Sequence, residues 1–175
     1  MSNLYESRNY DVSYRAILTN KETVKVFTEK DFIEVTSEVE FDSEKSQYSS
    51  LNYFASSIVG GIIHSLKNTS KRSGIFLSEI EGKIKIKLKN PLTLLGVKGY
   101  EEEPVISECS IIMYIYSELD DEEIIKFCEK ALKYCYIYNT VKKSINMEIK
   151  FLLSDTAFYN LFLSYWRECV GIEPT

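Results

Sequence analysis

Two residue types in this 175-residue chain could carry chemistry: four cysteines and a single histidine, His64. Cys128 and Cys135 lie seven residues apart in an amphipathic run, and His64 lies in a long run without charge. A thiolate can act as a nucleophile or redox centre, and imidazole can act as a base. One histidine without a Cys-x-x-Cys pair cannot complete a structural zinc site, so we expect no metal. No acid or serine is spaced to form a triad with His64.

Cys135 is open to three interpretations: a working thiol, the surviving half of a lost pair, or a small apolar filler. It closes the predicted helix 120–135. The apolar stripe of that helix is predicted to comprise Ile124, Ile125, Cys128, Ala131, Leu132 and Cys135. Both an apolar stripe and the negative end of a helix dipole disfavour a thiolate. A Cys128–Cys135 disulfide within one helix is geometrically poor, because about 10 Å of rise would separate the two residues.

Composition limits the class of protein. Hydrophobic residues make up 45% and charged residues 27% of the chain, which is typical of one folded domain. The net charge is −5 and no basic stripe is present, so we expect no nucleic-acid partner. The first 16 residues lack the apolar core of a signal peptide. Four cysteines in such a chain predict a cytoplasmic protein with mostly free thiols.

The elements that must position these residues begin with a sheet and a central helix. Residues 10–41 alternate in the manner of half-buried antiparallel strands, and Ser49 and Ser50 are good N-cap residues. Residues 51–66 have helical periodicity, and no side chain from Tyr48 to Leu66 is charged. We therefore predict a helix that is buried on all sides. Six nearby serines disfavour the alternative of a membrane span.

Small residues mark one side of this helix. Ser56 and Gly60 are four residues apart, as are Ser57 and Gly61, so a second helix or backbone could approach closely. Two glycines inside a helix cost about 1 kcal/mol each relative to alanine. Close packing or a bound ligand is the usual compensation.

The second half of the chain continues as strands 75–88 and 105–119, a helix opened by acids at Asp120 to Glu123, and a strand at 144–153. A last helix is predicted over 155–169, with Phe158, Phe162 and Trp166 packed on the body as a lid. The order βββ-α-ββ-α-β-α does not alternate regularly. The predicted class is therefore α+β with an antiparallel sheet.

Four stretches carry a family resemblance: "SSLNYFASSIVGG", the glycine of "KRSG", "LSEIEGKIKI" and "ALKYCYIYNTVKKSINMEI". Over residues 10–153 the chain resembles the osmotically inducible protein C and organic hydroperoxide resistance (OsmC/Ohr) family. The resemblance implies an intertwined homodimer in which sheets wrap two long central helices, with sites at the subunit interface. Members of that family act in the oxidative stress response by reducing organic hydroperoxides. A peroxidatic cysteine attacks, and a second cysteine resolves the sulfenic acid as a disulfide.

Carried over residue by residue, the family pattern is incomplete here. The resolving cysteine falls on Cys135, and the attacking cysteine falls on Gly61. The acid at the helix start falls on Asn52, or on Leu51 in the variant where it lies one residue earlier. The proline after the second cysteine is Tyr136. No cysteine precedes residue 109, so a shift of register does not recover the attacking thiol.

Two functions from different classes follow from these residues. The first is a divergent OsmC-like homodimer without peroxidase activity that binds a small apolar ligand where the thiols would have been. Its binding residues would be Gly61, Asn52, His64, Tyr136 and Tyr138, with Tyr53 and Phe54 as further lining residues. The alternative is a thiol-dependent hydroperoxide reductase relying on Cys135, or another chemistry using His64. A third hypothesis is a pseudoenzyme that only assembles with a partner.

The resemblance also divides the chain. We predict an OsmC-like domain over residues 1–153 and a C-terminal helical extension over residues 154–175. Neither a cofactor nor a membrane partner is expected.

Overall fold

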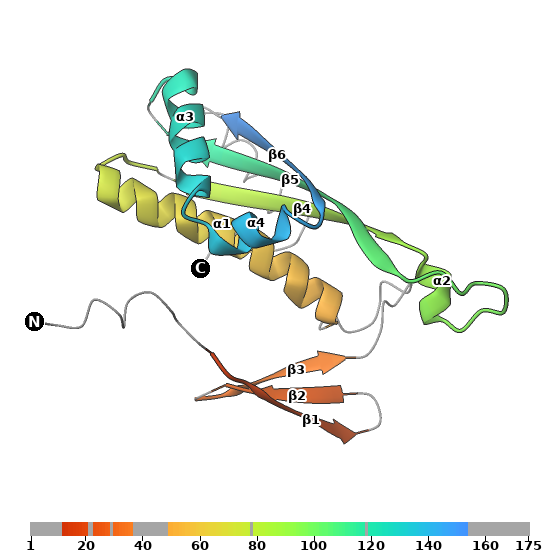
Figure 1. Cartoon of the computed structure of the whole chain (residues 1–175). Helices are drawn as coiled ribbons and strands as arrows, with labels where there is room; N and C mark the ends of the chain where they lie inside the picture. The colour runs from red at the N-terminus through yellow and green to blue at the C-terminus, as the bar shows by residue number, and fades with distance from the viewer. Residues whose placement is uncertain are drawn as a thin grey trace, which may run out of the picture. The chain divides into compact units, whose positions relative to one another are not determined.

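The structure, a computed structural model, describes residues 12–20, 23–28, 30–36, 49–77, 79–117 and 119–153 (Figure 1). The chain divides into two compact units, Met1–Phe54 and Ala55–Thr175. The predicted C-terminal helix over 155–169, with its lid role and Cys169, lies outside the described residues. The division into residues 1–153 and 154–175 therefore stays a prediction.

The first unit contains a three-stranded sheet, as predicted. Its strands are β1 (Arg15–Asn20), β2 (Thr23–Phe27) and β3 (Phe32–Thr36), paired antiparallel in that order. Because side chains alternate along each strand, the register gathers six apolar residues on one face. They are Ala16, Leu18, Val24, Val26, Ile33 and Val35. The other face carries an ion pair between Lys25 Nζ and Glu34 Oε1 at 3.3 Å.

The central helix α1 (Ser50–Ser73) begins and ends at recognisable caps. Ser49 Oγ accepts a hydrogen bond from the Asn52 amide at 3.3 Å, so the predicted N-cap is confirmed. At the other end Gly74 has a φ of 68°, and the Ile75 amide donates to the Ser70 carbonyl at 3.2 Å. This is the Schellman arrangement, which needs a residue that tolerates left-handed backbone.

Burial of α1 differs from the prediction. Ile58, Ile62 and Leu66 are fully buried at four-residue spacing, whereas Ser56, Ser57 and His64 are exposed. The prediction that the helix is buried on all sides is therefore wrong for the single chain. The reason is geometric, since packing on one sheet covers only one stripe of a helix.

The second unit is built on a mixed sheet of order β4-β5-β6. Strands β4 (Glu79–Lys89) and β5 (Val105–Tyr116) are antiparallel, and β5 and β6 (Asn146–Leu153) are parallel. The α+β class is confirmed, but the prediction of purely antiparallel pairing is wrong for β6. Helices α3 (Asp121–Leu132) and α4 (Tyr136–Val141), between β5 and β6, bring the chain back toward the end from which β5 runs. Strand β6 therefore runs in the same direction as β5 (Figure 1).

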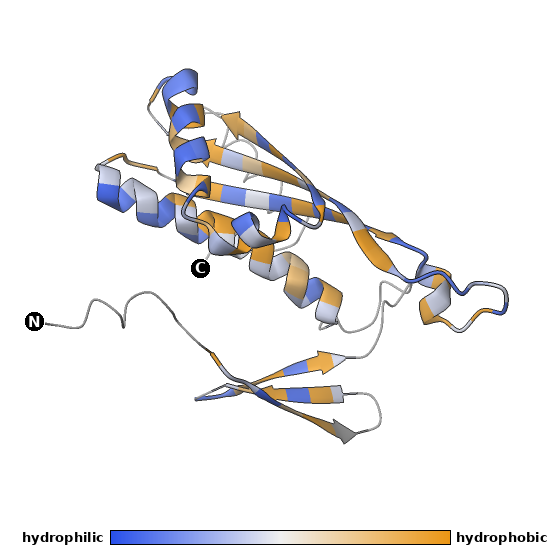
Figure 2. Ribbon diagram, in the orientation of Figure 1, coloured by the Kyte–Doolittle hydropathy of each residue, from blue (hydrophilic) through white to orange (hydrophobic). Residues whose placement is uncertain are grey.

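The core lies on one face of this sheet. Four alternate residues of β5, Cys109, Ile111, Met113 and Ile115, are at most 1% exposed. Figure 2 shows the alternation of apolar and polar residues along the strands. In β4, Gly82 pairs with Met113, and a Cβ at Gly82 would clash with Val59 Cγ2 of α1. A glycine at this position therefore lets α1 approach the sheet closely.

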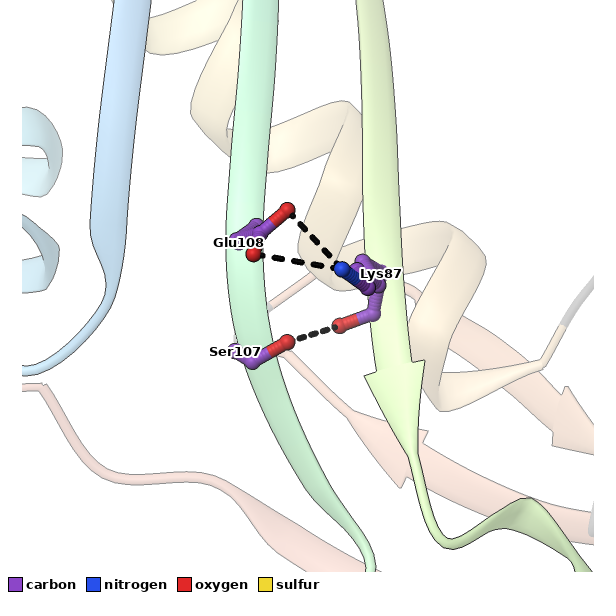
Figure 3. Close-up of polar contacts among 3 residues, drawn as sticks. All are labelled: Lys87, Ser107 and Glu108. Atoms are coloured by element: carbon purple, nitrogen blue, oxygen red, sulfur yellow. Dashed lines mark hydrogen bonds and ion pairs between the residues drawn. The ribbon is translucent and has the colours of Figure 1, made fainter.

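A β-bulge near the loop end of the β4–β5 hairpin shifts the pairing register of the two strands by one residue. Lys87 pairs with Glu108 but Leu88 pairs with Ile106, so Ser107 is the extra residue. Ser107 Oγ donates to the Lys87 carbonyl at 3.3 Å, and Lys87 Nζ lies 3.3 and 3.4 Å from the two Glu108 carboxylate oxygens (Figure 3). The extra residue places Ile106 opposite Leu88 on the apolar side of the sheet.

In the described part of this unit there are three shorter helices: α2 (Pro91–Leu94), α3 (Asp121–Leu132) and α4 (Tyr136–Val141). As predicted, α3 carries acids in its first turn. Its buried stripe includes Phe127, whereas Ile125, predicted to be buried, is 39% exposed. Helix α4 was not predicted. None of the helices in the described part of the chain combines the length and apolarity that a membrane span requires.

Candidate functional site

Gly61, the position where the family resemblance predicts the attacking thiol, packs against α4. A Cβ built on Gly61 of α1 would lie 3.0 Å from Ile137 Cδ1, which is closer than side chains normally pack. Ile137 belongs to α4 and lies two residues after Cys135. By contrast, a Cβ built on Gly60 would meet no described atom outside its own helical neighbourhood within 4 Å. The two adjacent glycines thus have different surroundings, one packed and one open.

Cys135 lies between two helices rather than at the end of one. Helix α3 ends at Leu132, and Cys135 is the N-cap residue of α4 with φ −86° and ψ 99°. Its carbonyl accepts from the Asn139 amide at 2.9 Å, and its amide donates to the Leu132 carbonyl at 3.0 Å. The side chain is buried, with 2% of its surface exposed. The prediction of a thiol on the C-terminal turn of a helix is therefore wrong, because an unpredicted helix starts at this residue.

The other described cysteines have the character of core residues. Burial raises the pKa of the Cys128 thiol to about 12, with a smaller contribution from the Glu129 carboxylate. Burial also raises the pKa of the Cys109 thiol. Cys109, Cys128 and Cys135 are all free. Among the described residues, no group of three or more His, Cys, Asp or Glu could hold a metal ion.

The remaining residues predicted for the site are more dispersed. Asn52 is exposed, and its nine-residue separation from Gly61 places the two about half a turn out of phase on α1. His64 is exposed on the same helix, and Tyr136 is 78% exposed. Tyr138 is half-buried, with Lys142 Nζ 4.6 Å from the centre of its ring. The structure thus brings Gly61 into contact with α4, and does not gather the whole predicted set.

Contacts that the sequence did not reveal fix α3 and α4. Ser65 Oγ of α1 donates to the Ala131 carbonyl of α3 at 2.7 Å, and this bond is buried. Asn139 Nδ2 of α4 donates to the Lys133 carbonyl at 2.9 Å and to the Leu132 carbonyl at 3.3 Å. An asparagine seven residues after the last residue of α3 is too weak a pattern to predict such a cap.

A known protein family shares the sequence of this region. The family model described as OsmC-like protein matches residues 42–150, which is more than half of the chain. The chain belongs to the OsmC-like family. The matched region contains α1 with Gly61, α3, and Cys135 with α4, so the recognised family covers the whole candidate site.

Solved structures of similar fold agree with this assignment. The OsmC-like protein of Mycoplasma pneumoniae is 14% identical with a TM-score of 0.66, covering 84% of this chain and 98% of that chain. An organic hydroperoxide resistance protein of Elizabethkingia anophelis is 15% identical with a TM-score of 0.64, covering 85% and 99%. At these identities the similarity shows a shared fold, which confirms the predicted OsmC/Ohr-like architecture. No curated protein sequence matches the chain.

Proposed function

We propose that this OsmC-like protein is a homodimer without thiol peroxidase activity that binds a small apolar ligand at the dimer interface. One observation supports the loss of activity above all others. The central helix carries glycine where the family resemblance expects the attacking cysteine, and no cysteine precedes residue 109. Gly61 packs against Ile137, an apolar side chain, rather than against a polar or charged group.

The chemistry of peroxide reduction explains why this replacement matters. A thiolate attacks the terminal peroxide oxygen, the O–O bond breaks, and the sulfur becomes a sulfenic acid while an alcohol leaves. A second thiol then condenses with the sulfenic acid, releases water and forms a disulfide. With glycine at position 61, Cys135 would have to perform the first step, and its side chain is 2% exposed.

One structural feature favours the alternative of a Cys135-dependent reductase. Cys135 is the N-cap residue of α4 and not a residue on the last turn of α3. The dipole argument against its thiolate, made for a helix C-terminus, therefore does not apply to α4. Burial of the side chain still restricts the access of a peroxide to the sulfur. The alternative is tested by the same experiment as the main proposal.

Ligand binding is supported by the space beside α1. Gly60 is open on the side where a side chain would project, and exposed Ser56 lies one turn before it. Pockets for small ligands are commonly apolar with a few polar groups. An apolar group bound here would be bordered by His64, one turn further along the helix.

The homodimer is supported by uncovered surface on both units. One apolar face of the β1–β3 sheet includes Leu18 and Ile33, which are 62% and 42% exposed. The side of α1 that bears Ser56 and His64 is also exposed, and it carries no charge before Lys67. Monomers seldom leave such surfaces uncovered, so a second copy would bury them. The three free cysteines that are described support the cytoplasmic location predicted from composition.

The proposal is tested by assaying hydroperoxide reduction with dithiothreitol or a dihydrolipoyl reductant. We expect background rates for the wild-type protein and for Cys135→Ser. Robust turnover that Cys135→Ser abolishes would instead establish Cys135 as a peroxidatic residue and overturn the proposal. The Gly61→Cys variant introduces a thiol at the position predicted for the attacking cysteine. On peroxide treatment it is expected to form a disulfide with Cys135, seen by mass spectrometry, if the two Cα atoms lie within about 7 Å.

A further inference from the structure

The β4–β5 loop presents an apolar surface rimmed by acids. Leu94, Leu95, Val97 and Tyr100 are 39–53% exposed. They are followed by three exposed glutamates, Glu101, Glu102 and Glu103, whose carboxylates form no ion pair among the described residues. We define these seven residues as the loop surface. An exposed apolar cluster of this kind commonly marks a site of interaction with another protein.

This loop has a defined conformation that holds the apolar side chains outward. Asn90 Nδ2 donates to the Glu103 carbonyl at 3.0 Å, and Thr93 Oγ1 donates to the Glu102 carbonyl at 2.8 Å. Gly96 and Gly99 have φ values of 63° and 88°, which glycine adopts without strain. The loop is therefore fixed across its base, and its exposed apolar residues are features of that conformation.

A second surface of opposite charge lies where α1 and α3 end. It consists of Lys67, Lys71, Arg72, Lys133 and Tyr134, and we call it the helix-end surface. Arg72 Cζ lies 4.8 Å from the centre of the Tyr134 ring, which is itself 58% exposed. The buried bond from Ser65 to the Ala131 carbonyl holds the two helices together just before this point.

Helix dipoles account for part of this surface but not for all of it. Bases near helix C-termini are favoured by the dipole, which explains Lys71 and Arg72 in the last turn of α1. The helix dipole does not explain why exposed Tyr134 stacks against Arg72. Aromatic residues and arginine are the types enriched where proteins meet. In the described part of the chain, the four bases of this surface form no ion pair.

In Figure 1 the α2 loop and the C-terminal end of α1 lie at opposite ends of the second unit, so the loop surface and the helix-end surface that they carry are far apart. They therefore cannot meet within one chain. Two copies related by a two-fold axis, lying antiparallel, would bring each loop surface to the partner's helix-end surface and form the contact twice. We propose that the acidic and apolar loop surface docks on the helix-end surface of a second copy of this chain.

This inference rests on the proposed homodimer and extends it by naming the contact. Glutamates would face lysines and Arg72, while the apolar loop residues would pack on Tyr134. Charge complementarity of this kind fixes the register of an interface and disfavours wrong pairings.

Disulfide trapping tests the contact directly. The variant Tyr100→Cys/Tyr134→Cys, made in a chain with Cys169→Ser, is oxidised with diamide and run on a non-reducing gel. We expect a covalent dimer. The matched control, Tyr100→Cys/Glu79→Cys, places the second thiol at the start of β4 instead, where we expect no covalent dimer. Light scattering of the same unoxidised samples reports the oligomeric state separately.

The outcomes distinguish this inference from the proposed function. If light scattering shows a dimer but the Tyr100→Cys/Tyr134→Cys variant forms no disulfide between chains, the docking contact is wrong and the homodimer is retained. A monomer overturns both. A ladder of trimers and longer products overturns the two-fold arrangement, because it indicates head-to-tail contacts.

Charge reversal provides a second measurement. Arg72→Glu is expected to weaken the dimer about tenfold in Kd, and adding Glu102→Lys in the same chain is expected to restore most of the loss. If Arg72 acted only on the dipole of α1, Glu102→Lys would restore nothing. Failure of this rescue would therefore contradict the contact.

Discussion

Gly82 controls how closely α1, the helix that carries Gly61, approaches the β4–β5–β6 sheet. A Cβ at this position would clash with Val59 Cγ2 and would lie 3.1 Å from Met113 Sδ and 3.3 Å from Met113 Cε. The methionine end can shift, because thioether side chains are flexible. Val59 is held by the backbone of α1, and its branched side chain has few alternative rotamers. Gly82→Ala is therefore predicted to destabilise the protein mainly through Val59.

The expected magnitude follows from two opposing terms. Overpacking of a core costs about 1–3 kcal/mol, whereas replacing a strand glycine by alanine gains about 0.5–1 kcal/mol. The free energy of unfolding should fall by about 0.5–2 kcal/mol. In a Val59→Ala background the obstructing methyl group is gone, so the same Gly82→Ala change should be neutral or stabilising by up to about 1 kcal/mol.

Urea denaturation of the wild-type protein, Gly82→Ala, Val59→Ala and the double variant compares the effect of Gly82→Ala in the two backgrounds. The protein concentration is held constant, since the apparent stability of an oligomer depends on it. An equal loss from Gly82→Ala in both backgrounds would refute the argument, because it would show that Val59 does not lie over Gly82. An increase in the slope of the denaturant dependence would indicate a changed unfolded or native state instead.

Three further predictions concern the contacts around the site. Ser65→Ala removes the buried bond to the Ala131 carbonyl and should cost about 1 kcal/mol in urea denaturation, whereas exposed Ser56→Ala should change stability by less than about 0.5 kcal/mol. Asn139→Ala leaves two carbonyls at the end of α3 without their side-chain donor and should cost about 1 kcal/mol, with faster amide exchange in α4. Because the pKa of Cys128 is raised from 9.0 to about 12 in the folded state, the unfolded thiol ionises first as pH rises. Stability should therefore decline above about pH 9, and Cys128→Ala should lessen that decline in denaturation measured from pH 8 to 10.

Local patterns in the sequence were sufficient for most of the elements. The Ser49 cap, the α1 stripe of Ile58, Ile62 and Leu66, and the acids that open α3 each depend on neighbours within a few residues. The order of elements indicated an α+β class, and the matching stretches indicated the OsmC/Ohr fold. Helix α4 was missed because Tyr136 to Val141 are mainly aromatic and β-branched residues, which favour strands. Packing of Ile137 on Gly61 and the capping bonds of Asn139 overcome that preference.

The sequence by itself determined which chemical groups this protein has: glycine at position 61, asparagine at position 52, and Cys135 in the second half of the chain. Only the tertiary structure decided that β6 runs parallel to β5, that α1 is covered on one stripe, and that Cys135 begins a helix. The physical reason is that residue types and caps act over a few neighbouring residues. Strand direction, burial and the packing of Gly61 depend instead on contacts between segments that are distant in the chain, which no local pattern contains.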